Sequence, residues 1–141
     1  MKELFKQEML IHCMMAKFHW TLAIIKPGDR TIYYMNPMEE SINSIKKEES
    51  KWNHYLQQRY GISEKFRILT SPHAKQADGI SCGVFCLKFA ENYINGEELV
   101  TTFPIKEVNA YRKIVVQLLL DEGGFPGNTA RSLKRKKEIY G

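Results

Sequence analysis

The sequence predicts an α+β fold, in which a small central sheet is flanked by helices and a buried helix begins at a cysteine. Three observations support this. Short runs rich in β-branched and aromatic residues alternate with longer stretches of helical spacing. The turn signal Lys26-Pro27-Gly28-Asp29 separates two of those runs and indicates a hairpin. The chain has 141 residues, 43% of them hydrophobic, which suits one domain with a modest core.

The predicted strands lie mostly in the first half of the chain. Residues 9–15 form a mostly apolar run that is typical of a buried strand or of the end of a helix. Residues 20–25 and 31–35 are expected to pair as the hairpin, and Pro37 ends its second strand. A third strand is expected over residues 65–70.

Three helices are predicted between and after these strands. Residues 39–60 carry apolar side chains at helical spacing and are followed by Gly61, a common helix stop. After a loop at residues 72–80, residues 82–94 are apolar on almost every side, which indicates a buried helix. Residues 104–120 begin with proline and precede Gly123-Gly124, as a last helix would.

Four polar or reactive side chains could form one nucleophilic site. Cys82 supplies a thiol, His19 an imidazole and Asn36 an amide, which are the three parts of a Cys-His-Asn arrangement. His19 precedes one hairpin strand and Asn36 follows the other, so the hairpin is expected to bring them together. The first turn of a buried helix stabilises a thiolate at Cys82. Gln76, six residues earlier, could donate to an oxyanion.

Each of these residues also has an ordinary structural explanation when it is taken alone. A cysteine in an apolar helix is usually a small core residue, as we expect for Cys86. A metal site built from Cys82, Cys86 and either His12 or Cys13 is a weaker alternative, because no second paired motif accompanies it. We therefore expect no metal and no cofactor. The remaining histidines, His12, His54 and His73, are predicted to be surface or loop residues without partners.

The charge distribution and the cysteine content indicate how the chain is divided and in which compartment it functions. Residues 131–141 hold five of the 21 basic residues and one of the 16 acidic residues, which leaves the rest of the chain nearly neutral. We therefore divide the chain into a catalytic domain at residues 1–126 and a basic tail at residues 127–141. The three cysteines, an odd number without framework spacing, favour a reducing intracellular setting, nucleus or cytoplasm. No signal peptide or membrane-spanning run is evident.

The chain resembles the ubiquitin-like-protein-specific (sentrin/SUMO-specific, Ulp-type) cysteine proteases of the adenain-like clan. The resemblance covers roughly residues 9–120. It is carried by His19-Trp20-Thr-Leu, the tyrosine-rich strand before Asn36, and Gln76 with Asp78-Gly79 before Cys82-Gly83-Val84-Phe85. It implies a papain-like, adenain-like fold.

The resemblance also implies a role for each of these residues. His19 would be the general base, Asn36 the residue that orients it, Gln76 the oxyanion residue and Cys82 the nucleophile. Trp20 resembles the aromatic residue that covers a channel for a Gly-Gly tail. Gly83 leaves room beside the sulfur for the substrate.

Three departures from the family pattern stand out. The family usually has Asp at the position of Asn36, and Asn keeps the hydrogen bond but loses the charge, as in papain-like enzymes. Ser81 stands where an Asp is common. Family catalytic domains also carry a substantial segment before the histidine strand, so we expect this chain to lack the N-terminal part of the domain.

Three functions follow as competing hypotheses. The first is a monomeric cysteine isopeptidase or endopeptidase that cleaves after the C-terminal Gly-Gly of a SUMO-like or other ubiquitin-like modifier, with that modifier or its conjugates as partner. The second is a catalytically silent, modifier-binding or mobile-element-derived fragment of the same fold. The third is nucleic-acid binding through residues 131–137, which we disfavour because the body of the chain is nearly neutral.

Overall fold

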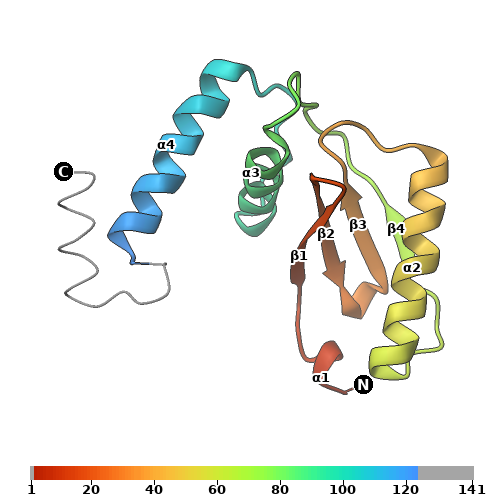
Figure 1. The fold of residues 1–141 in the computed structure, drawn as a ribbon. Helices are drawn as coiled ribbons and strands as arrows, with labels where there is room; N and C mark the ends of the chain where they lie inside the picture. The colour runs from red at the N-terminus through yellow and green to blue at the C-terminus, as the bar shows by residue number, and fades with distance from the viewer. Residues whose placement is uncertain (1, 124–141) are drawn as a thin grey trace. The chain divides into compact units, whose positions relative to one another are not determined.

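The computed structural model describes residues 2–123, which fall into two compact units (Figure 1). The first unit extends to Phe103 and holds the sheet, and the second begins at Pro104. The expected boundary between residues 126 and 127, and the basic cluster at residues 131–137, lie outside the described residues. Within the described part of the chain, no helix is long and apolar enough to cross a membrane.

Four strands of the described chain form one mixed sheet in the order β1-β2-β3-β4. Their bounds are β1 Leu10–Ala16, β2 His19–Lys26, β3 Thr31–Met35 and β4 Arg67–Leu69. The first three are antiparallel neighbours, and β4 pairs with β3 in parallel. The hairpin predicted from the Lys26–Asp29 turn is confirmed, and the turn itself is a short 3-10 helix, η1, at Pro27–Asp29.

The first strand corrects one expectation. Residues 9–15 were predicted to be a buried strand or a helix end, and β1 is a strand whose side chains are mostly exposed. It lies at the edge of the sheet and pairs only with β2 among the described strands. Apolar side chains therefore reach solvent there, with Met15 58% exposed.

Helices α1 (Lys2–Phe5), α2 (Ile42–Tyr60) and α3 (Cys82–Ile94) belong to the first unit, and α4 (Ile105–Asp121) belongs to the second. Helix α2 begins at Ile42 rather than at residue 39, because Ser41 forms a reciprocal capping box with Ser44. Gly61 ends it in the left-handed conformation that favours glycine. Helix α3 spans the predicted residues.

Within the first unit, α2 and α3 lie on opposite sides of the sheet (Figure 1). The face with Ala23, Ile25, Ile32 and Tyr34 packs in one buried cluster with Trp52 and Leu56 of α2. The alternate residues of the strands face the other way, where the ring of Tyr33 contacts that of Tyr93 on α3. Burial on both faces fixes the register, and hence the strand ends that carry the site.

Candidate active site

The ends of β2 and β3 bring His19 and Asn36 into direct contact. Leu22 pairs with Met35 in the antiparallel register, so the residues just beyond this pair share one end of the sheet. The Nε2 atom of His19 lies 2.7 Å from Oδ1 of Asn36. The predicted hairpin thus brings His19 and Asn36 into contact, as expected.

The hydrogen bonds of Asn36 define the tautomer of His19. Oδ1 of Asn36 also accepts a hydrogen bond from the backbone amide of Met38 at 2.9 Å, so it is the oxygen of the side chain that lies there. An oxygen can only accept, so Nε2 of His19 must carry a proton and donate it. In the neutral ring Nδ1 is then unprotonated, and it is the nitrogen available to take up a proton.

Cys82 is the first residue of α3 and is 5% exposed. Its sulfur accepts a hydrogen bond from the backbone amide of Trp20, with a nitrogen-to-sulfur distance of 3.4 Å. Trp20 directly follows His19 in β2, so the thiol and the imidazole belong to the same corner of the molecule. The amide donor and the positive end of the α3 dipole both favour negative charge on the sulfur.

The segment before α3 is held by Asp78. One oxygen of its carboxylate accepts hydrogen bonds from the amides of Ile80 and Ser81, at 3.0 and 2.8 Å. The other oxygen accepts from the hydroxyl of Ser81 at 2.6 Å. Ser81 is thus a buried polar residue that directly precedes Cys82.

The indole of Trp20 lies against Gly83. A Cβ atom added at Gly83 would lie 3.5 Å from Cδ1 of that ring, an ordinary van der Waals distance. Packing within the chain therefore does not require glycine at this position. Trp20 is 38% exposed, so part of its ring is open to an incoming molecule.

Gln76 lies beside the loop that carries Asn36. Its backbone amide donates to the carbonyl of Pro37 at 2.8 Å, and its side-chain Nε2 donates to the carbonyl of Asp78 at 2.7 Å. Its Oε1 is buried and has no hydrogen-bond partner among the described residues. The bond to a carbonyl fixes Nε2, not Oε1, on the Asp78 side, and the amide keeps a second N–H.

A buried ion pair next to this loop was missed by the sequence analysis. His73, expected to be a surface or loop residue without a partner, does lie in a loop, but its side chain is only 2% exposed and Nε2 lies 2.6 Å from Oε1 of Glu40. Its Nδ1 lies 2.7 Å from the carbonyl of Ala74. The partners are 33 positions apart, and no local pattern links them. The apolar spacing predicts that Glu40 belongs to the helix, whereas it precedes the helix cap at Ser41.

The ion pair shifts the pKa of both partners. Burial disfavours the charged form of Glu40, but hydrogen bonds from His73 and the Asn36 amide outweigh it and hold the pKa of the carboxyl below its usual value. Burial likewise opposes protonation of His73, but the hydrogen bonds to Glu40 and the Ala74 carbonyl raise its pKa. Each partner therefore favours the charged form of the other.

The other two thiols differ from Cys82 in their surroundings. Cys86 is 1% exposed, which confirms the prediction of a core residue, and burial raises its pKa to about 12, with a smaller effect of Cys13 and Cys82. Desolvation also raises the pKa of Cys13. Within residues 2–123, no group of three or more His, Cys, Asp or Glu side chains could hold a metal ion.

Comparison with solved structures shows a shared fold. The SUMO protease Ulp1 with its catalytic cysteine oxidized to a sulfenic acid matches with a TM-score of 0.69 and 20% identity, over 84% of this chain and 55% of that one. The Ulp1-like SUMO protease catalytic domain of Chaetomium thermophilum matches with a TM-score of 0.69 and 21% identity, over 94% and 53%. The chain thus spans about half the length of these proteins.

A third structure is the C-terminal Ulp1 protease domain in complex with Smt3, the yeast ortholog of SUMO. It has a TM-score of 0.69 and 20% identity over 85% of this chain and 55% of that one. Among curated proteins, no sequence matches this chain. The model of the Ulp1 protease family, C-terminal catalytic domain, matches residues 1–119. The chain therefore belongs to the Ulp1 family of cysteine proteases.

Proposed function

We propose that this chain supplies a cysteine peptidase site that cleaves after the C-terminal Gly-Gly of a SUMO-like or other ubiquitin-like modifier. The observation that carries the proposal is the His19–Asn36 hydrogen bond beside a thiol at the start of α3. It leaves the imidazole with Nδ1 free to act as a base. Cys82, His19, Asn36 and Gln76 then take the roles of nucleophile, base, orienting residue and oxyanion donor.

The reaction would proceed through two displacements at one carbonyl. His19 takes the thiol proton of Cys82 on Nδ1, and the thiolate attacks the carbonyl carbon of the terminal glycine. The second N–H of the Gln76 amide would donate to the oxyanion. His19 returns the proton to the leaving lysine amine, which departs and leaves a thioester. Water, deprotonated by His19, then releases the glycine carboxylate and regenerates the thiol.

The preference for glycine would come from the surroundings of Trp20. A partly exposed indole can cover an extended Gly-Gly backbone, and any Cβ on that backbone would meet the ring. Gly83 supports this proposal because packing within the chain leaves its missing side chain unexplained. A related protease domain has been solved in complex with Smt3, which makes a SUMO-like protein the first substrate to test.

The proposed setting follows from the thiols and from the family. The described chain contains three free cysteines, as an intracellular thiol enzyme in a reducing compartment would. We expect the chain to act as a monomer on a modifier precursor or a modifier–lysine conjugate.

Turnover of a modifier precursor tests this function. The substrate is a SUMO precursor with a short extension after Gly-Gly, and the product is the shortened protein measured by mass. The parent chain should release the extension, Cys82→Ser should not, and Cys86→Ser should retain activity if it stays folded. Binding of the modifier without any cleavage would contradict the peptidase and favour the silent binding module. Cleavage that survives Cys82→Ser would remove Cys82 as the nucleophile.

A further inference from the structure

We propose that Glu40 and His73 are positioning residues for the Cys82 site: their buried ion pair holds Asn36 in place, and Asn36 in turn holds the ring of His19. This inference rests on the proposed function, because it assigns the pair a role in the same reaction. Neither residue belongs to the four that carry the chemistry.

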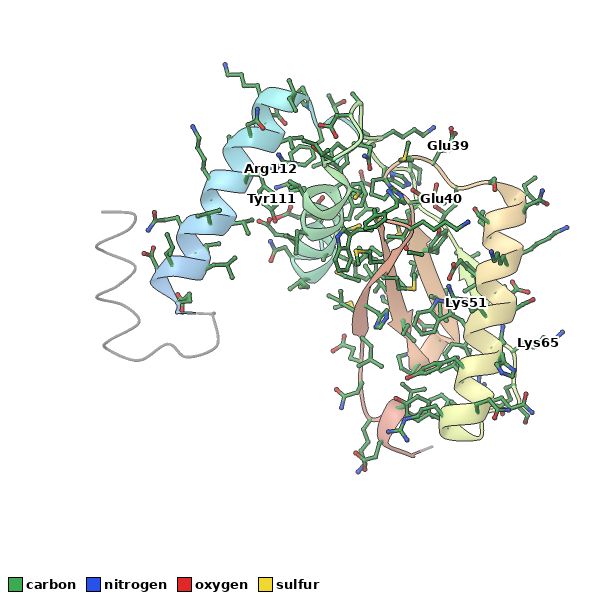
Figure 2. All side chains as sticks on the ribbon, in the orientation of Figure 1. Glu39, Glu40, Lys51, Lys65, Tyr111 and Arg112 are labelled. Carbon is green, nitrogen blue, oxygen red and sulfur yellow. The ribbon has the colours of Figure 1, made fainter. Side chains whose placement is uncertain are left out.

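The first step is the contact between Glu40 and the backbone of Asn36. Oε1 of Glu40 accepts a hydrogen bond from the Asn36 amide at 2.6 Å and also lies 2.6 Å from Nε2 of His73. Glu40 precedes α2, in the segment that leads from β3 into this helix (Figure 2). One oxygen atom therefore joins the backbone of the orienting residue to the buried histidine.

The second step concerns the charge of His73. Its two ring nitrogens face Oε1 of Glu40 and the carbonyl oxygen of Ala74. A carbonyl and a carboxylate both accept, so both ring nitrogens must donate, and the ring is an imidazolium. The hydrogen bond from Nε2 of this charged ring to the Glu40 carboxylate, whose side chain is 9% exposed, is short and strongly directional.

The third step is that the pair joins the two loops that carry site residues. His73 lies three residues before Gln76, and Glu40 lies four residues after Asn36. The amide of Gln76 donates to Pro37 in the same region, and the ring of His73 packs on Phe89 of α3 with centroids 5.0 Å apart. The ion pair thus fastens the Asn36 loop to the Gln76 loop and to the helix that begins at Cys82.

Other titratable groups lie around the pair. Lys75 opposes the charge of His73 and pairs with Glu39 at 2.6 Å, with side chains 53% and 63% exposed. The phenol of Tyr34 on β3 faces Glu40 and Glu48. Because the Lys75–Glu39 pair joins the same loops at the exposed surface, it provides a matched control for the buried pair.

The test uses the full chain and two readouts that need no modifier. One is the rate at which iodoacetamide alkylates Cys82, and the other is the ¹⁵N chemical shift of the His19 ring, which reports the fraction with a proton on Nε2. Glu40→Ala should slow alkylation by up to about 100-fold, the order expected for a displacement of roughly 1 Å at a reacting group. Glu40→Gln keeps an oxygen for the Asn36 amide and should lose less. Glu39→Gln should change neither readout.

A double-mutant cycle separates positioning from general stability. If Glu40 acts through Asn36, Glu40→Ala should have little further effect in an Asn36→Ala background, because the two losses are not additive. Losses that add fully, with melting temperatures lowered in parallel, would overturn the proposal. An unchanged His19 tautomer in Asn36→Ala would also overturn it. Asn36 would then not control the His19 ring, so the ion pair could not act on the ring through Asn36.

The modifier assay distinguishes this result from the proposed function. A positioning role predicts a lower kcat with KM nearly unchanged for Glu40→Gln. If the chain cleaves no modifier but the cycle shows coupling, the function is wrong and the positioning stands. If the chain cleaves the modifier but the cycle shows no coupling, the positioning is wrong and the function stands.

Discussion

The side chain of Asn36 has two hydrogen-bond donors around a single oxygen, the Met38 amide and Nε2 of His19. A carboxylate could accept both of these hydrogen bonds, but the Asn36 side chain also forms a hydrogen bond with the phenol of Tyr34. The amide can orient the imidazole, but it adds no negative charge when the ring becomes positive. Substitutions at Asn36 can therefore separate the effect of orienting the His19 ring from the effect of a negative charge beside it.

Substitution of Asn36 should resolve these two contributions. Asn36→Asp should preserve or raise modifier cleavage, since both hydrogen bonds remain and the added charge stabilises the imidazolium. Asn36→Ala should lower kcat by about tenfold or more, a part of the 10²–10⁴-fold that general acid–base catalysis contributes. Steady-state rates on the SUMO precursor measure both. Equal activity of parent, Asp and Ala variants would remove Asn36 from the site.

The three thiols should differ in reactivity. Burial raises the pKa of Cys86 to about 12, so this thiol is protonated at any physiological pH, and desolvation also raises the pKa of Cys13. Cys82, with an amide donor on its sulfur, should be alkylated first by iodoacetamide under mildly acidic conditions. Peptide mapping of alkylation against pH gives the three rates. Faster alkylation of Cys13 or Cys86 there would contradict the assignment of the nucleophile.

At the scale of elements, the turn between β1 and β2 has an unusual sequence for its backbone conformation. Ala16 pairs with His19, so Lys17 and Phe18 form a two-residue connection, and both have positive φ, at 52° and 62°. Such turns favour Asn-Gly, because a Cβ in the left-handed region costs roughly 1–2 kcal/mol per residue. The strain adjoins His19, and Phe18 is 95% exposed.

Replacing this turn by Asn-Gly should stabilise the fold. The double variant Lys17→Asn/Phe18→Gly should gain about 1 kcal/mol, after allowing for the added freedom of glycine in the unfolded chain. This corresponds to a rise of roughly 4 °C in the melting temperature for a chain of this size. Lys65→Asn, at an exposed position without positive φ, serves as the control. A lower melting temperature than the parent would show that the turn is not strained.

The Glu40–His73 pair should make stability depend on pH from both sides. The pKa of His73 is raised, so its contribution is full below the unfolded value, about 6.5, and is lost as pH rises through the folded value. The pKa of Glu40 is lowered, so its contribution is full above about 4.3 and is lost as pH falls through the folded value.

Thermal unfolding against pH measures this dependence. The difference in stability between the parent and Glu40→Gln/His73→Gln should be largest between about pH 4.3 and 6.5 and should shrink on both sides. His54→Gln, at an exposed histidine on α2, serves as the control for the loss of an imidazole. A parent-minus-variant difference that does not vary with pH would contradict the ion pair.

At the scale of the whole molecule, the sequence predicts what depends on local pattern. The hairpin, the extent of α3 and the approach of His19 to Asn36 follow from strand periodicity, a turn signal and an apolar helix that begins at Cys82. The start of α2 was placed three residues early because the Ser41–Ser44 capping box is weaker in sequence than the apolar spacing.

The features that the sequence did not predict depend on contacts between distant segments. The exposure of β1 depends on its place at the edge of the sheet, which no local pattern records. The Lys17–Phe18 turn is an exception, because it is local; it was not predicted because it contains neither glycine nor asparagine. His73 looks like an ordinary loop residue until the fold places Glu40 beside it. The catalytic roles of Cys82, His19, Asn36 and Gln76 remain predictions, as do the substrate-binding roles of Trp20 and Gly83.

Covalent capture by a modifier tests the central claim most directly. A SUMO protein whose C-terminal glycine carries a vinyl sulfone should form one adduct with the full chain, and peptide mapping should place it on Cys82. Cys82→Ser should abolish the adduct, whereas Cys86→Ser should retain it. Failure to form an adduct while iodoacetamide still alkylates Cys82, or capture at Cys13 instead, would contradict a Gly-Gly-directed site built on Cys82, His19 and Asn36.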